Sequence, residues 1–134
     1  MIEAPLNVLM RTLIPLLKDD DALSGMIGTR VYDSVPMTAA FPYVSLGAAW
    51  EMQDDADCIP SVEVGFRVDV WSRAVSSAEA RSIAHRLRSL LHNLELDLSE
   101  GALAMLEHRR SDTMRDPDGR TNHIAIELTA VIET

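Results

Sequence analysis

The sequence predicts an α+β fold: a single antiparallel or mixed sheet of about five strands, with one long helix and one or two shorter helices packed mainly on one face. Two adjoining segments predict it. Residues 62–70 alternate strictly, with Val or Phe at every second position, which is typical of a half-buried strand. Residues 80–94 place Ala, Ile and Leu at i, i+3, i+4 and i+7 spacing, which is typical of an amphipathic helix. A strand followed by a long helix allows that helix to lie back across the sheet.

The N-terminal segment predicts a first helix. Leucine and methionine recur with helical spacing over residues 6–17, and Pro5 suits the first turn of a helix. Pro15 lacks the N–H that would bond the carbonyl group of Arg11, so we expect the helix to end or kink near Pro15.

A short second helix is predicted next. One of the three consecutive aspartates at 19–21 is expected to cap a helix over residues 22–27, which Gly28 closes. We prefer this interpretation to a metal site because carboxylate cages need spaced ligands with a turn between them. Residues 29–35 are rich in β-branched and aromatic side chains, which predicts a strand.

The middle of the chain predicts another strand and a long connection. A proline-bounded loop over 36–42 leads into a strand over 43–50. Residues 51–60 are polar and acidic and end in Pro60, so we expect an exposed, mobile connection of the kind that often carries a contact function. The side chains expected on one side of the strand are those of Val44, Leu46, Ala48 and Trp50.

The C-terminal half predicts the long helix and a terminal hairpin. Ser76 with Glu79 has the spacing of a capping box. Less regular alternation predicts a strand over 103–112, and strict alternation predicts another over 124–132. The Asp-Pro-Asp-Gly sequence at 116–119 suits a type I turn that joins them. The pattern leaves the register open, so that either Arg109 or Arg110 faces Glu127.

Composition limits the possible functions. The chain has 134 residues, which predicts one domain over 1–134, and a formal net charge of −9. That charge disfavours wrapping of nucleic acid, because phosphates are repelled. The candidate basic patches are Arg109–Arg110 and three arginines of the long helix, which we interpret as its solvated face. Those helix arginines are Arg81, Arg86 and Arg88.

Cellular location is indicated by what the sequence lacks. The single Cys58 excludes an internal disulfide and fits a reducing compartment. No apolar run approaches the ~20 residues that a membrane span needs. The first ten residues have no basic region before an apolar core, so we expect no secretory signal and synthesis in the cytoplasm.

No catalytic motif is present. The sequence contains no nucleophile elbow, P-loop or dinucleotide fingerprint. His85 and His92 are not at the i, i+4 spacing of metal ligands, and we interpret His108 and His123 as a polar pair across the hairpin. We therefore predict no catalytic residue, no cofactor and no metal. The competing hypothesis is a small metal- or ligand-binding domain that uses the acidic loops.

Trp71 lies on the strand face opposite the valines. Two interpretations are open: it packs under a loop or beside the first helix, or it anchors a subunit interface, where Trp and Arg are enriched. A sheet face that the helices do not cover would favour association. We predict a subunit contact on that face or edge, formed by Arg67, Trp71, Arg109 and Glu127.

Five segments in order carry a family resemblance. They are L-x-D-D-D-A-L-S-G-M-I-G-T-R-V-Y-D-S-V-P, F-P-Y-V-S-L-G, F-R-V-D-V-W-S, S-x-x-E-A and R-D-P-D-G-R-T-N-H. Together they resemble the tail-completion, or tail-terminator, proteins of long-tailed bacteriophages and gene transfer agents, over about residues 6–132. Pro15, inside the first helix, is a departure from that pattern.

The resemblance implies a non-enzymatic virion protein of the tail, assembled in the host bacterial cytoplasm. It implies a homo-oligomeric ring, usually hexameric, that caps the tail tube, stops its polymerisation and offers a surface to the head connector. Its partners would be the tube protein and the connector, with DNA passing unbound through the lumen and no membrane. The alternative of the same kind is a head-side connector or stopper ring. The loops expected to dock on tube or connector contain Gln53, Asp54, Asp55, Asp57, Arg115, Asp116, Asp118 and Arg120.

Overall fold

The computed structural model describes residues 1–55 and 58–134, and it confirms the predicted α+β class. Its strands form one mixed sheet in the order β1-β2-β3-β5-β4, in which β1 is parallel to β2 and the other neighbours are antiparallel. The elements in chain order are α1 (Pro5–Asp19), α2 (Asp21–Ile27), β1 (Val31–Tyr32), β2 (Tyr43–Asp54), β3 (Ser61–Ser72), α3 (Ala78–Leu91), β4 (Ala102–Arg115) and β5 (Asn122–Glu133).

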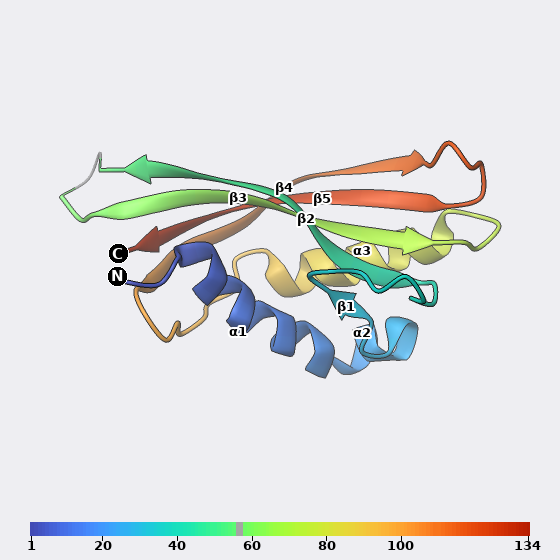
Figure 1. The fold of residues 1–134 in the computed structure, drawn as a ribbon, viewed down its shortest axis with the longest axis horizontal. Coiled ribbons are helices and arrows are strands. Elements are labelled where there is room, and N and C mark those ends of the chain that lie inside the picture. Colours follow the sequence, from blue (N-terminus) through green and yellow to red (C-terminus); the bar gives the residue numbers. More distant parts are fainter. Residues whose placement is uncertain (56–57) are drawn as a thin grey trace.

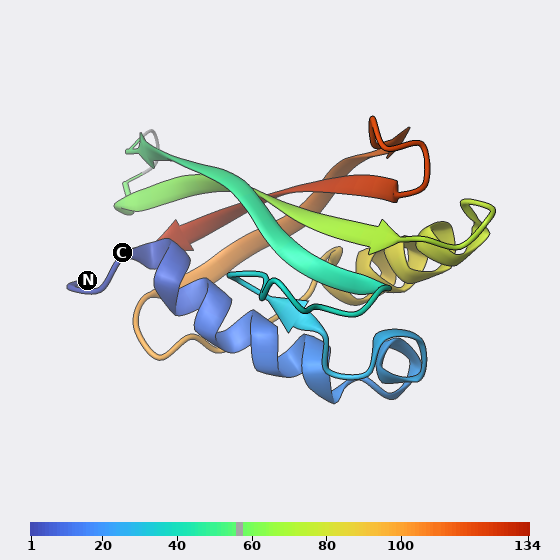
Figure 2. The ribbon, with the colours of Figure 1, turned by 45° about the vertical axis from the view of Figure 1, so that its right-hand side comes forward.

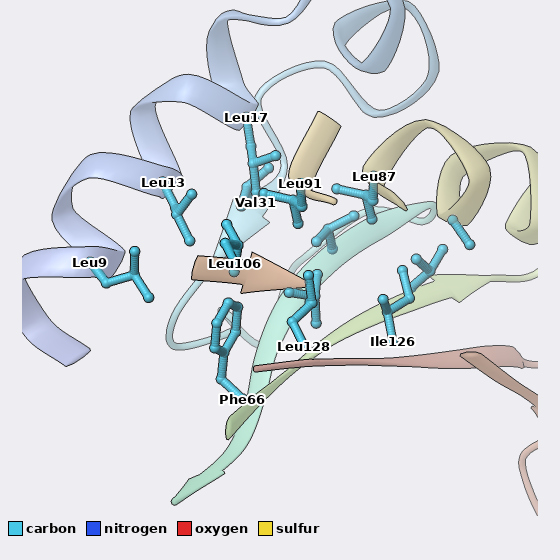
Figure 3. Packing of buried hydrophobic residues seen from close by; sticks show 14 of the residues in the cluster. Leu9, Leu13, Leu17, Val31, Phe66, Leu87, Leu91, Leu106, Ile126 and Leu128 are labelled. Carbon is cyan, nitrogen blue, oxygen red and sulfur yellow. The ribbon is translucent and has the colours of Figure 1, made fainter. Parts of the chain in front are cut away.

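The three helices lie on one face of the sheet, and the other face carries no helix (Figures 1 and 2). We call this second face the open face. Instead of one long helix there are two of similar length, since α1 has 15 residues and α3 has 14. Their leucines meet the apolar side chains of β3 and β5 in the core (Figure 3). The central contacts involve Leu9, Leu13, Leu17, Phe66, Leu87, Leu91, Ile126 and Leu128.

The expected break at Pro15 is wrong, because α1 continues to Asp19. Pro15 and Arg11 both lie on the exposed side of the helix. The carbonyl group that Pro15 leaves without an N–H partner can therefore be hydrated. Leu13 and Leu17 are buried on the opposite side, and their packing holds the helix on the sheet through the proline.

Of the three aspartates at 19–21, one of which was predicted to cap α2, Asp20 is the cap, and its side chain also links two helices. Its Oδ2 accepts the N–H of Leu23 at 2.9 Å, and Gly28 closes the helix with φ of +61°. The guanidinium of Arg86 donates to both oxygens of the same carboxylate, at 2.9 and 2.6 Å. The hydrogen bond from Arg86 is the main reason that the pKa of Asp20 is lowered. One carboxylate thus caps α2 and fixes it to α3.

The capping box predicted for α3 is wrong. The N-cap residue is Ser77, whose side chain makes no cap hydrogen bond. Glu79 instead accepts a hydrogen bond from the hydroxyl of Ser72, at the end of β3, at 2.8 Å. The hydroxyl of Ser76 accepts the N–H of Ala78 at 3.3 Å. Glu79 therefore links the helix to the preceding strand, a tertiary contact that spacing along the chain does not reveal.

Strand boundaries in the first half of the sheet differ from the predictions. Of residues 29–35, only Val31–Tyr32 is a strand. Strand β2 continues to Asp54, so that the first four residues of the predicted connection over 51–60 belong to the sheet. We call residues 50–55 and 58–63, at the end of the hairpin between β2 and β3, the hairpin tip; residues 56 and 57 lie outside the described part of the chain and are not included in it.

A β-bulge in β2 reverses the predicted orientation of Trp50. Leu46 pairs with Val68, whereas Ala49 pairs with Phe66, so β2 carries one extra residue between them. One extra residue moves every later side chain to the opposite face. Trp50 is consequently paired with Gly65 on the open face, instead of sharing the helix-covered face with Val44.

The register of the C-terminal hairpin places Arg110, not Arg109, opposite Glu127. Strand β4 is also longer than predicted, and it has register shifts beside Leu103 and His108. The predicted pairing of His108 with His123 is wrong, because His108 faces Leu128 and His123 faces Met114. These two histidines therefore lie on opposite faces of the sheet.

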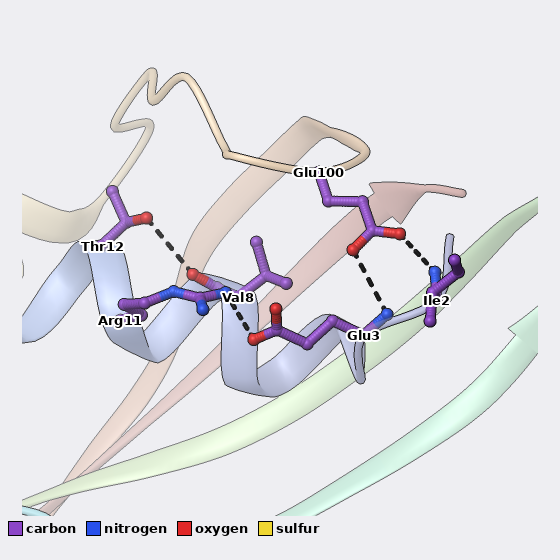
Figure 4. Close-up of polar contacts among 6 residues, drawn as sticks. All are labelled: Ile2, Glu3, Val8, Arg11, Thr12 and Glu100. Atoms are coloured by element: carbon purple, nitrogen blue, oxygen red, sulfur yellow. Dashed lines mark hydrogen bonds and ion pairs between the residues drawn. The ribbon is translucent and has the colours of Figure 1, made fainter.

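The N-terminal segment is held by Glu100, from the connection that precedes β4 (Figure 4). The Glu100 carboxylate accepts the backbone N–H groups of Ile2 and Glu3, and these hydrogen bonds lower its pKa. Glu3 in turn pairs with Arg11 of α1. The start of the chain is thereby fixed to the loop that crosses beneath the sheet.

Candidate assembly surfaces

A buried polar cluster lies on the open face. The Asp69 side chain is only 3% exposed, and its Oδ1 lies 2.7 Å from Nε2 of His123 and 2.9 Å from Nε of Arg67. The indole ring of Trp71 stacks on His123, with ring centroids 3.8 Å apart, and its N–H donates to the hydroxyl of Ser45 at 2.9 Å. The cluster joins β2, β3 and β5 through side chains that carry charge or hydrogen-bonding groups.

The four residues predicted for the subunit contact all lie on the open face. Arg67 and Glu127 are directly opposite each other on β3 and β5. Arg109, in the β4 bulge, donates to the hydroxyl of Thr129 at 2.6 Å. Trp71 packs against Tyr43 and His123 of the neighbouring strands, on the face away from α1, so it does not lie beside the first helix.

Trp50 is an exposed aromatic side chain on this face that the sequence prediction placed on the wrong side. It is 49% exposed and covers Gly65, where an added Cβ atom would lie 2.2 Å from the indole ring. A glycine inside a regular strand often marks such a close approach. Gly65 was therefore the one feature of the sequence that could have indicated a large side chain packed over this position of β3. A cleft on this face is lined by Trp50, Gly65, Arg67, Arg109, Glu127 and Thr129.

The residues predicted for docking fall into two groups at opposite ends of the sheet (Figure 1). Gln53 and Asp54 belong to β2 and not to a loop, and the Gln53 amide donates to Asp55 at 2.8 Å. Asp57 lies outside the described residues. In the second group, Arg115 ends β4, and the turn before β5 contains Asp116, Asp118 and Arg120.

Asp118 organises the turn between β4 and β5. Its carboxylate accepts the N–H groups of Arg120 and Thr121, both at 2.9 Å, and the hydroxyl of Thr121 at 2.7 Å. These hydrogen bonds lower the pKa of Asp118 to about 2. The N–H of Gly119 donates to the Asp116 carbonyl at 2.9 Å, which completes the turn that the Asp-Pro-Asp-Gly sequence predicts.

We expect the β4–β5 turn to keep its structure well into the acidic range. Because the pKa of Asp118 is depressed in the folded chain, its stabilising effect is complete above the unfolded value near 3.8 and is lost as pH falls through about 2. A carboxyl-carbon NMR titration measures this directly. Asp118→Asn should abolish the titration and weaken hydrogen-exchange protection of the Thr121 amide at neutral pH. A midpoint for Asp118 near 4 would contradict the expectation.

Within the described residues, no three His, Cys, Asp or Glu side chains are grouped to hold a metal ion. None of the helices in that part of the chain combines the length and hydrophobicity needed to cross a membrane. The features that the structure does offer are surfaces: the open face, the hairpin tip and the β4–β5 turn.

Comparison with known proteins identifies the family of this chain. The family model described as "Tail completion protein gp17" matches residues 11–133. The chain belongs to this tail completion family. A solved structure described as the virion of a native gene transfer agent particle contains a chain that is 26% identical, with a TM-score of 0.90 and 98% of each chain covered. None of the curated proteins matches. Together these findings make the protein a structural protein of the virion tail, as the resemblance in the sequence predicts.

Proposed function

We propose that this protein is a subunit of a closed ring, usually a hexamer, that caps the tail tube, ends its polymerisation and presents a surface to the head connector. The likeness to a chain of a gene transfer agent virion, over 98% of both chains, carries the proposal. Membership of the tail completion family supports it. The protein acts through assembly and not through catalysis.

The open face supports a repeated contact between subunits. A cyclic ring uses one heterologous interface, in which two different patches of the same chain meet. Exposed apolar side chains and arginines are typical of such patches, and Trp50 and Met52 are about half exposed here. We assign Arg67, Trp71, Arg109 and Glu127 to one of the two patches. Ring size and stability unchanged by Trp71→Ala would show that the assignment of Trp71 is wrong.

The charge of the chain fits a ring around a DNA path. With 21 acidic and 12 basic residues, a lumen formed by this protein offers DNA few phosphate contacts, so that the polymer passes without being held. The β4–β5 turn and the hairpin tip lie at opposite ends of the sheet. Their separation supports contacts with different neighbours, among which we include the tube or the connector.

We expect the protein to shorten tail tubes as they polymerise. Tube protein from the same particle is allowed to assemble with increasing amounts of this protein, and tube lengths are measured by negative-stain electron microscopy. The mean length should fall as the ratio rises, with a ring of extra density at one end only. Tubes of unchanged length, with both ends bare, would rule out the capping role. Density on isolated connectors but not on tubes would favour the head-side stopper.

A further inference from the structure

A groove runs between α3 and β4, away from the open face. Its walls are Arg81, His85 and Arg88 of the helix and His108, Ser111 and Thr113 of the strand, and its floor contains Ala84 and Ile124. It has a volume of about 500 Å³. A second hollow lined by Arg88, Ser89, His92 and His108 adjoins it. We call the two together the cationic groove.

The two arginines of the groove have no partner within the described part of the chain. The other helix arginine, Arg86, is paired with Asp20. The side chains of Arg81 and Arg88, by contrast, form no ion pair or hydrogen bond among those residues. They lie two helical turns apart on one face of α3, a separation of about 10 Å. Since acidic residues outnumber basic ones by 21 to 12, two unpaired guanidinium groups on one groove favour an anionic occupant from outside.

The histidines of the groove are held in place by their own contacts. Nδ1 of His92 accepts the backbone N–H of His108 at 3.1 Å, and Nε2 of His108 lies 2.8 Å from the hydroxyl of Ser111. Burial is the main cause of the lowered pKa of His108, and the positive charge of Arg88 lowers it further. The groove is therefore a region of positive potential with a partly apolar floor.

The hairpin tip has the complementary composition. Its described residues include four acidic ones, Glu51, Asp54, Asp55 and Glu63, and no lysine or arginine. Exposed apolar side chains accompany these charges, since Trp50, Met52 and Ile59 are 49%, 55% and 54% exposed. The tip projects from the end of the sheet that is farthest from α3 (Figures 1 and 2). It cannot enter the groove of its own chain.

We propose that the cationic groove binds the acidic hairpin tip of a neighbouring copy, so that copies associate head to tail. This inference rests on the proposed ring. It supplies the groove as the second patch and extends the open-face patch to the hairpin tip, whose Trp50 lines the same cleft as Arg67, Arg109 and Glu127. A heterologous contact requires complementary patches at different places on the same chain. Groove and tip satisfy that requirement in charge, in apolar content and in position. A nucleic acid is the less favoured occupant, because its phosphates are repelled by the net charge of −9.

Two charge-reversal variants test the contact. The groove variant is Arg81→Glu with Arg88→Glu, and the tip variant is Glu51→Lys with Glu63→Lys. Each alone should weaken self-association, measured by sedimentation velocity at low salt, at least tenfold, because like charges then face each other. An equimolar mixture should regain the association of the wild type, since each reversed groove meets a reversed tip. The control, Arg11→Glu with Lys18→Glu on the exposed side of α1, changes the net charge as the groove variant does and should leave association unchanged.

The outcomes separate this contact from the proposed function. Variants that associate like the wild type, a mixture that is not rescued, or a wild type that stays monomeric at millimolar concentration would overturn the contact. Binding of duplex DNA that only the groove variant loses, with self-association unchanged, would also overturn it. Failure of the proposed function shows elsewhere, in wild-type protein that leaves tube length unaffected. Circular dichroism melts identify any variant that has simply failed to fold.

Discussion

Asp69→Ala is expected to lower the free energy of unfolding by about 3 kcal/mol, the upper end of the range for leaving a buried hydrogen-bonding group without its partner. Asp69 and His123 are both buried on the open face, with 3% and 9% of their side chains exposed. Without the carboxylate, the His123 ring keeps its place under Trp71 but loses its acceptor. The Arg67 guanidinium, which is 39% exposed, can turn to water, and this keeps the loss from being larger.

The measurement is equilibrium unfolding in urea, with the slope compared between variants to confirm that the same surface is exposed on unfolding. Asp112→Ala is the matched control, since Asp112 also pairs with an arginine, Arg110, but on the exposed surface of β4. That substitution should leave the unfolding midpoint unchanged. Equal effects of the two substitutions would show that the buried cluster contributes no more than a surface pair.

Leu87→Ala is expected to cost about 2–5 kcal/mol of stability, the usual range for a leucine whose removal leaves a cavity in a packed core. Leu87 is fully buried and lies where α3 meets the sheet (Figure 3). It is also on the helix that forms one wall of the cationic groove. Loss of its packing should therefore loosen the groove as well as the core.

Leu90→Ala on the same helix is the control, because Leu90 is only partly buried. Its loss should cost less than half as much, since surface that is already hydrated leaves little cavity. Both values follow from chemical unfolding, and hydrogen exchange in α3 reports whether the helix loosens locally. Equal losses for the two variants would contradict the packing that the structure shows.

The local sequence pattern was sufficient to predict the most regular helix and strands of the fold. The alternation in β3 and β5 and the stripe of α3 identified them because the periods of strand and helix are properties of the backbone itself. The cap at Asp20 and the turn at Asp116 were equally predictable, since each depends on contacts between residues at most three apart. The predicted contact residues on β3 and β5 share the open face for the same reason: position in an alternating strand decides the face.

Other features depend on partners that are distant in the chain. Pro15 was read as a break, but the burial of Leu13 and Leu17 against the sheet outweighs one missing hydrogen bond. Glu79 was read as a local cap, but the hydroxyl of Ser72 binds it. The bulge in β2 moved Trp50 to the open face, because one extra residue in a strand reverses every side chain that follows.

The sequence by itself determined the fold class, the family resemblance and the acidic character of the protein, because these follow from pattern and composition. Only the tertiary structure showed which arginines of α3 are paired. The sequence pattern had placed all three on one solvated face of the helix. Arg86 meets Asp20 across 66 residues of chain, whereas the side chains of Arg81 and Arg88 border a groove and have no ion-pair partner in the described part of the chain. Whether a charge is paired depends on which distant segment the fold brings beside it, and local sequence does not contain that information.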